Sequence, residues 1–268
     1  MTLTGAGTVV LQASQAATGG YTSGIQTGTF VVATKSQTIT FPAPASPVNY
    51  GLSPLSLAAS ASSGLPVTLS VVSGPASIGG NALTITGTGM IVVAADQSGN
   101  MNYAAATEVT RSITVNKIAP TAQLTASSNP ILVQTTVTLT ATVSSTASMP
   151  SGYIVFSDSG TPLGTVSLSG GIATMTIPTL TAGTHSITAI YSGDGNFSSI
   201  NSATLVEAVQ DFTLTMGGSG SSQTIQPGAT ATFTLLMSPS GGTTFPAAIT
   251  FSASGLPTGF TATLVQHR

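Results

Sequence analysis

The chain has 268 residues, of which 4% are charged and none is cysteine, and its net charge at pH 7 is −2. Four Lys and Arg residues cannot neutralise the phosphates of a nucleic acid, so nucleic-acid binding is excluded. A chain without cysteine has no disulfides and no site in which cysteine holds zinc or an iron–sulfur cluster. Ser and Thr supply roughly a third of the residues, beside many Val and Ile, and such a composition favours strands. We therefore predict an all-β fold.

Two stretches near the start of the chain repeat each other. Residues 3–21 read LTGAGTVVLQASQAATGGY and residues 85–103 read ITGTGMIVVAADQSGNMNY, so that Tyr21 corresponds to Tyr103. The likeness continues through residues 29–35 and 112–117 after a slip of one position. The interval between Tyr21 and Tyr103 is too long for a solenoid repeat and suits a small β-sandwich.

A third unit follows a linker that ends at Pro120. Between residues 137 and 143 apolar residues alternate with threonines, and this period of two predicts a half-buried strand. The residues expected on its inner face are Val137, Leu139, Ala141 and Val143. Further strands are predicted at residues 121–127, 152–156, 162–168, 172–177, 184–191 and 200–208. Seven short strands in about 90 residues are typical of an immunoglobulin-like (Ig-like) sandwich.

The last unit begins near Asp211 and is short. Strands are predicted at residues 212–216, 231–235 and 249–251, with turns at 226–228 and 255–259. These strands are too few to close a sandwich of the size predicted just upstream. We therefore expect both ends of the chain to lie inside a domain. The final His267 and Arg268 depart from the pattern with which such a unit would continue.

Residues 121–209 resemble the bacterial Ig-like repeat domains that occur in tandem in very large exported proteins. The stretch that carries this resemblance most clearly is LTAGTHSITAIYSGDGNF, at residues 180–197. Residues 211–260 resemble the front half of another such module, in which GLP followed by Gly, here at residues 255–259, is typical.

The segment from Gln37 to Lys117 is similar to the MBG-type repeats that often accompany these domains. The likeness rests on QTITF at residues 37–41, SSGLPV at residues 62–67 and GNMNYAAAT at residues 99–107. The resemblance implies a β-sandwich fold and says little about function, because these families share no catalytic residues.

The repeat and the resemblance together predict four segments. They are the C-terminal part of an MBG-type module at 1–35, a complete MBG-type module at 36–117, a complete bacterial Ig-like sandwich at 118–209 and the N-terminal part of a further Ig-like module at 210–268. We refer to residues 36–117 as the second module and to residues 118–209 as the third module.

The resemblance implies a non-catalytic structural and adhesive stalk segment of a secreted or cell-surface bacterial protein, located outside the cell. Two alternatives are a carbohydrate- or protein-binding module appended to an extracellular enzyme, and a phage or secretion-system surface protein. Expected partners are neighbouring Ig-like modules, with a host or cell-surface protein or glycan as a further candidate. No cofactor is expected. The longest apolar run, Met90 to Ala95, is far short of the ~20 residues that span a bilayer, so no membrane insertion is predicted, and a signal peptide and anchor are expected outside this fragment.

The one combination that resembles a catalytic triad is His185, Ser192 and Asp194. On the strand prediction His185, Ile187, Ala189 and Tyr191 share one face, and Ser192 and Asp194 follow in a turn. Seven strand residues span about 23 Å, far beyond hydrogen-bond reach. We therefore predict no enzyme and no catalytic residues.

The turn Gly193-Asp-Gly-Asn196 carries oxygen ligands of the kind that calcium prefers. A calcium site needs six to eight oxygens, and the nearest other acid along the chain is Glu207. Asp194 and Asn196 are thus weak calcium candidates. The preferred interpretation is a turn in which both side chains bond their own backbone and glycine adopts a positive φ.

Three aromatic residues, Tyr21, Tyr103 and Phe197, each follow a Gly-containing turn. They are expected to plug the end of a sandwich, with sugar binding by an exposed ring as the alternative. Tyr153 differs, because Ile154 and Phe156 are expected to face inward and leave it outside. Tyr153 is the best single candidate for an adhesive contact.

Overall fold

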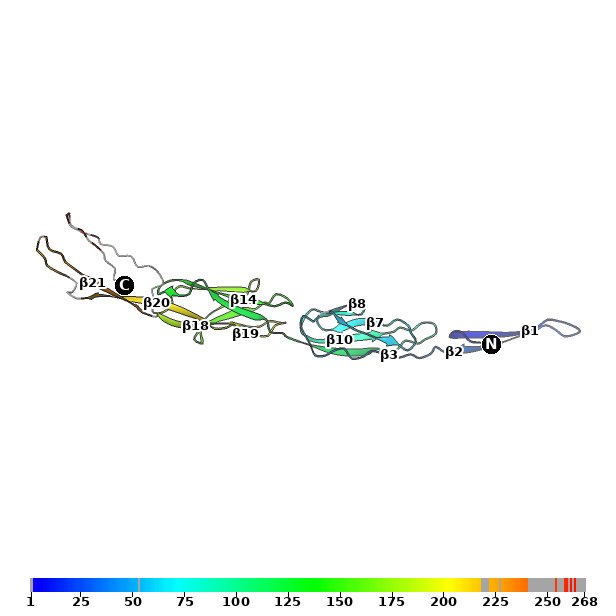
Figure 1. Ribbon diagram of the computed structural model, residues 1–268. Helices are drawn as coiled ribbons and strands as arrows, with labels where there is room; N and C mark the ends of the chain where they lie inside the picture. Colours follow the sequence, from blue (N-terminus) through cyan, green and yellow to red (C-terminus); the bar gives the residue numbers. More distant parts are fainter. Residues whose placement is uncertain are drawn as a thin grey trace. The chain divides into compact units, whose positions relative to one another are not determined.

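A computed structural model of the chain describes residues 2–52, 54–217, 222–226 and 228–240, with residues 254, 258, 259, 261 and 263. Every regular element in these residues is a strand, which confirms the all-β prediction (Figure 1). None of them forms a helix that could cross a membrane. The chain divides into two compact units. The first comprises the chain up to Ala119 with Thr146–Ser148 and Gly195–Ser198, and the second comprises Pro120–Ser145, Met149–Asp194 and the chain from Ser199 onward.

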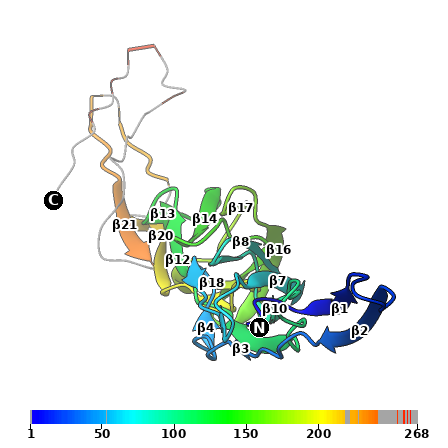
Figure 2. The ribbon, with the colours of Figure 1, turned by 90° about the vertical axis from the view of Figure 1, so that its right-hand side faces the viewer.

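The first strands form an antiparallel ribbon of β1 (Gly7–Gln15) and β2 (Gly24–Val32). All residues of these two strands are exposed or half-buried. Figure 2 shows β1 and β2 side by side, joined by one loop. Among the described residues these two strands pair only with each other, so the ribbon has no second layer to cover its apolar side chains.

The second module is built around a sheet with the strand order β4-β11-β10-β7. Its strands are β4 (Val48–Asn49), β7 (Thr68–Ser73), β10 (Gly89–Asp96) and β11 (Val109–Asn116). Short strands pack against it: β3 (Ile39–Thr40), β5 (Leu55–Ser56), β6 (Ser60–Ala61), β8 (Ala76–Gly79) and β9 (Ala82–Ile85). Both groups contribute to one apolar core that includes Phe41, Leu57, Leu83, Ile91, Val93 and Ile113. Burial of such side chains is the main stabilising contribution.

The pairing register of two hairpins agrees with the internal repeat. In the β1–β2 ribbon Gly7 pairs with Val32, and in the β10–β11 hairpin Gly89 pairs with Val115. Gly7 and Gly89 are separated by the same interval as the two repeated tyrosines, whereas Val32 and Val115 are one position further apart. The structure therefore contains the slip of one position that the sequence comparison requires.

The third module consists of two sheets, ordered β12-β14-β17 and β13-β20-β18-β15-β16. Their strands are β12 (Thr121–Ala126), β13 (Ile131–Leu132), β14 (Val137–Ser144), β15 (Tyr153–Asp158), β16 (Thr161–Ser167), β17 (Ile172–Ile177), β18 (Gly183–Tyr191) and β20 (Leu205–Gly217), with β19 (Ile200–Asn201) beside β18. Six predicted strands are confirmed to within two residues, and the alternation in β14 is also confirmed. The four apolar residues expected on its inner face are all buried.

Two details of the strand prediction are wrong. The strand predicted at 200–208 is interrupted after Asn201, and β20 then runs without a break through the predicted strand at 212–216. No Gly or Pro occurs between Leu205 and Met216, so the sequence offers nothing to end the strand there. The short strand β13 was not predicted. It pairs with β20 in parallel over only two residues, which is too short for a periodic pattern.

Beyond residue 210, β20 pairs with β21 (Thr234–Ser240). The strand predicted at 231–235 therefore begins and ends later than expected. The predicted turn at 226–228 is supported by a hydrogen bond of 3.1 Å that the Ala229 amide donates to the Gln226 carbonyl. The strand predicted at 249–251, most of the turn at 255–259 and the final His267 and Arg268 lie outside the described residues.

Candidate functional site

The triad-like residues occupy the positions that the strand prediction gives them. His185, Ile187, Ala189 and Tyr191 all lie on the buried face of β18. Ser192 follows the strand, where its Oγ donates to the Gly193 carbonyl at 2.8 Å and accepts from the Tyr153 amide at 3.1 Å. The Ser192 hydroxyl therefore bonds backbone groups at one end of β18, whereas His185 bonds other partners at the opposite end.

The partners of His185 come from a neighbouring strand and a turn. Its Nδ1 lies 2.5 Å from Oδ2 of Asp158, at the end of β15, and its Nε2 lies 2.9 Å from the Thr181 carbonyl oxygen. A carbonyl oxygen can only accept, so Nε2 carries a hydrogen. A carboxylate facing Nδ1 favours a second hydrogen there. The geometry thus favours the imidazolium form and an ion pair with Asp158.

Glu207 completes a buried acidic and basic cluster. It lies opposite His185 in the antiparallel pairing of β18 with β20, and its side chain is 0% exposed. Neither carboxylate oxygen has a hydrogen-bond partner among the described residues. A carboxylate in this situation is strongly disfavoured, because its lost hydration is not replaced.

Burial and neighbouring charges shift the pKa values of two members of the cluster and of Tyr191. Burial raises the pKa of Glu207, and the positive charge of His185 only partly opposes that effect. Burial alone would lower the pKa of His185, but its hydrogen bonds to Asp158 and Thr181 and the charges of Asp158 and Glu207 raise it overall. Burial, aided by the charge of Asp194, raises the pKa of Tyr191 to about 12.

This cluster was missed in the sequence because its members are distant along the chain. Asp158, His185 and Glu207 meet only through the strand order β20-β18-β15. The groups that bond His185 are a carboxylate and a peptide carbonyl, and neither can be activated as a nucleophile by a base. The arrangement therefore couples the protonation of these groups to the stability of the module.

The two calcium candidates are engaged separately. Oδ2 of Asp194 accepts hydrogen bonds from the amide and the hydroxyl of Ser151, at 2.9 and 2.8 Å. Oδ1 of Asn196 accepts from the Thr88 amide at 3.1 Å, within the first compact unit. Gly193 has the expected positive φ of 76°. These hydrogen bonds come from residues distant in sequence, and the prediction that both side chains bond their own turn stays a prediction.

Replacing Asp194 with Ala is expected to lower the free energy of unfolding of the third module by about 1 kcal/mol, because both hydrogen bonds from Ser151 are lost at an exposed position. Millimolar calcium is expected to leave the melting temperature of the wild-type chain unchanged. Thermal unfolding followed by circular dichroism, with and without calcium, measures both effects. A rise in melting temperature with calcium that is absent in Asp194→Ala would instead support a calcium site at Asp194.

The aromatic residues differ in their surroundings. Phe197 is 1% exposed, and its ring lies edge-on to Tyr50 with centroids 5.8 Å apart, within the first unit. Tyr103 is half-buried and forms a bridge with Lys35. Tyr21 is 75% exposed, so the prediction that it plugs a sandwich is wrong for the described chain, where the ribbon that carries it has no second layer.

Tyr153 lies on the outer face of its sheet, as predicted. It is 47% exposed, whereas Ile154 and Phe156 on the same strand are buried. Across the strand pair it faces Ser167. The outer face therefore presents an aromatic ring beside a small hydroxyl side chain.

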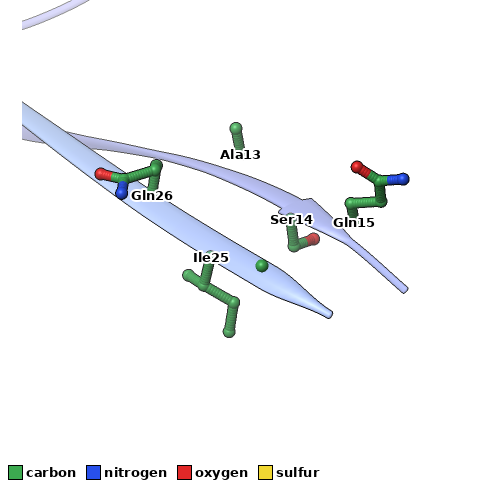
Figure 3. A pocket seen from close by; sticks show the side chains of 6 residues that line it. Ala13, Ser14, Gln15, Ile25 and Gln26 are labelled. Carbon is green, nitrogen blue, oxygen red and sulfur yellow. The ribbon is translucent and has the colours of Figure 1, made fainter. Parts of the chain in front are cut away.

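A shallow hollow lies at the far end of the β1–β2 ribbon, and Figure 3 shows its lining. Ala13, Gln15 and Gln26 point to one side of the ribbon, and Ser14 and Ile25 point to the other. The lining contains no charged side chain and no aromatic ring. It is the uncovered surface of a two-stranded ribbon and does not resemble the concave, mostly enclosed sites that hold small molecules.

Comparison with known proteins finds a family match for one segment of the chain. Residues 124–210 match the family model of the bacterial Ig-like domain (group 3). No curated protein matches the chain in sequence.

Solved structures with similar folds share little sequence with this chain. The fibronectin(III)-like modules of CbhA from Clostridium thermocellum are 18% identical, with 64% of this chain and 91% of that chain covered and a TM-score of 0.29. The Escherichia coli adhesin FdeC is 18% identical, with 69% and 68% covered and a TM-score of 0.28. A Ca²⁺-stabilized adhesin with which an Antarctic bacterium binds ice is 14% identical, with 80% and 60% covered and a TM-score of 0.28. Likenesses at these TM-scores support no inference about function. The likeness to a family rests on the sequence match alone, which relates residues 124–210 of this chain to the bacterial Ig-like domain (group 3).

Proposed function

We propose that the chain is a non-catalytic stalk segment of a secreted or cell-surface bacterial protein, with a structural and adhesive role. The observation that carries the proposal is the family match of residues 124–210 to a bacterial Ig-like domain. Families of this kind are typically non-catalytic and support a structural or adhesive role at a surface. Neighbouring Ig-like modules are its proposed partners.

The contacts of the ionisable side chains in the third module support a structural role. His185 and Asp158 pair with each other, and Asp194 is held by Ser151. Glu207 is enclosed in the core, out of reach of a substrate. Each of these groups therefore serves the fold of the third module.

The proposed organisation places two complete modules in succession, at residues 36–117 and 118–209, between parts of further modules at 1–35 and 210–268. Each complete module has its own buried core. A series of separately folded modules provides reach and spacing, and each can unfold under load without its neighbours.

Stretching the full chain between its ends should therefore give two separate unfolding events. When a module unfolds, each of its residues adds about 3.6 Å of extended chain, and the length of the folded module is subtracted. The expected increments are about 25 nm for the second module and about 29 nm for the third. Single-molecule force spectroscopy measures these increments. One cooperative event that combines both increments, or gradual extension without steps, would contradict the proposed organisation.

A second candidate function is a carbohydrate- or protein-binding module appended to an extracellular enzyme. The exposed ring of Tyr153 on a sheet face is the observation that favours it, with a host or cell-surface protein or a glycan as the partner. Binding to a glycan array or to a cell surface that is lost in Tyr153→Ala would distinguish this function from a passive spacer.

A further inference from the structure

The internal repeat shows what covers a hairpin of this type. With Tyr21 aligned to Tyr103 and the slip of one position allowed, the pair Val9 and Phe30 in the β1–β2 ribbon corresponds to a pair in the β10–β11 hairpin. That second pair is Ile91 and Ile113. The correspondence continues along both strands, so that Leu11 stands where the second copy has Val93. The two hairpins are therefore the same structural element in two different surroundings.

In the second copy this element is covered on its edge and on one face. Strand β7 pairs with β10, with Val71 opposite Val93 and Leu69 opposite Ala95. Phe41 and Leu83, from outside the sheet, share a buried core with the inner face of the hairpin. A polar contact fixes the far end of β10, where Gln97 accepts a hydrogen bond from Gln37.

In the first copy the equivalent surface is open among the described residues. Leu11 is 48% exposed, whereas Val93 is 0% exposed. Val9 and Phe30 are half-buried, although the residues at their places in the second copy are fully buried. Strand β1 pairs only with β2, which leaves the backbone groups of its other edge without strand partners in the described chain. An isolated two-stranded ribbon is marginal in water, and an apolar edge strand readily accepts another strand.

We propose that the β1–β2 ribbon is a docking surface for a polypeptide segment with the strand pattern of residues 36–82. A strand equivalent to β7 pairs along the free edge of β1, with its Val71 position opposite Leu11 and its Leu69 position opposite Ala13. The rest of the segment covers Leu11, Val9 and Phe30. This proposal rests on the organisation proposed above, in which residues 1–35 are part of a further module.

The chemistry of the ribbon favours a polypeptide over a sugar or a charged ligand. Residues 7–32 contain no Asp, Glu, Lys or Arg. They expose several aliphatic side chains beside Thr, Ser and Gln side chains and the ring of Tyr21. They also present a row of backbone amides and carbonyls, which another strand satisfies by β-augmentation. Gln15 stands where Gln97 bonds Gln37, so a polar residue at the start of the segment has a partner as well.

The test is a chain in which a copy of residues 36–82 is added directly ahead of Met1. Met1 corresponds to Leu83 in the repeat, so the added copy is connected to β1 in the same way as residues 36–82 are connected to β10. Hydrogen–deuterium exchange by mass spectrometry is compared between this chain and the unmodified chain. We expect the amides of β1 and β2 to exchange at least ~100-fold more slowly in the extended chain, since they become part of a closed core.

The matched control carries Leu69→Asp and Val71→Asp in the added copy only. It should leave β1 and β2 as unprotected as in the unmodified chain, while β10 and β11 stay equally protected in all three proteins. Equal exchange of β1 with and without the extension, or equal protection by the control, would overturn the proposal. If the extended chain is insoluble, adding the peptide of residues 66–75 to the unmodified chain decides the question with the same readout and a scrambled peptide as control. If β1 is already protected in an unmodified chain that sediments as a dimer, the occupant is a second copy and the proposal fails.

Discussion

Replacing Phe156 with Ala will lower the free energy of unfolding of the third module by about 3 to 5 kcal/mol. The ring is 0% exposed in β15, an interior strand of its sheet, and its strand neighbours on either side are Gly164 and Ala189. Neither of these small residues can expand into the space that the ring leaves. A cavity in a close-packed core forfeits both burial and dispersion contacts.

Because the chain contains more than one module, a single unfolding curve does not isolate this effect. Hydrogen exchange of the amides in β15 and β18 in the absence of denaturant reports the third module by itself. The amides of β10 and β11, in the second module, are the internal reference and should not change.

Tyr153→Ala is the matched control, on the same strand and also aromatic to Ala. The ring is exposed, so its removal is expected to change the free energy of unfolding by less than about 1 kcal/mol. If both variants lose equal stability, Tyr153 is part of the core and is not available to a partner. If Tyr153→Ala alone is neutral, a binding defect in that variant can be assigned to the surface.

The sequence predicts the third module well because its strands alternate clearly. In β14 each inward residue is apolar and each outward one is polar, so the strand and its buried face are predicted together. The distinction between Phe156 and Tyr153 follows from the same alternation. The alternation of apolar and polar residues is a local property of one strand, and it does not depend on which strands lie beside it.

The sequence does not predict the contacts that depend on strand order. Asp158 and Glu207 reach His185 because β15 and β20 lie on either side of β18, and nothing local to any of the three residues shows this. The same applies to Asp194, whose donors on Ser151 lie 43 positions away. The exposure of Tyr21 also differs from its prediction because the burial of a ribbon depends on strands that are not part of it.

The stability of the third module will fall as the pH is raised above about 4.5, until the folded-state pKa values of Glu207 and His185 are passed. The folded-state pKa of Glu207 lies above its ordinary value of 4.5, so above that value the folded chain holds a proton that the unfolded chain has lost. His185 acts in the same direction above its ordinary value of 6.5, because its pKa is raised as well. In both cases the folded state binds more protons than the unfolded state, and stability decreases with rising pH until the folded-state pKa is passed.

This decline is measured by unfolding the chain in urea at a series of pH values. Hydrogen exchange of the β18 amides is the probe that reports the third module. Glu207→Gln should abolish the part that begins near pH 4.5 and retain the part that begins near pH 6.5. Glu108→Gln changes an exposed carboxylate in the first unit and should leave the profile unaltered. A stability that rises between pH 5 and 8 would contradict the protonation states assigned to the cluster.

Glu207→Leu separates the effect of burial from the effect of charge pairing. Removing an enclosed carboxyl group whose oxygens have no hydrogen-bond partner in the described chain should raise the stability at pH 8 by about 1 to 3 kcal/mol. The gain should shrink at pH 4, where the wild-type side chain is neutral and its burial is less unfavourable. His185 keeps Asp158 as its partner in this variant, so its own contribution is largely preserved. If Glu207→Leu is instead less stable than the wild type at pH 8, the attraction between Glu207 and His185 outweighs the burial of the carboxylate, and the cluster is then a net stabilising ion pair in the core.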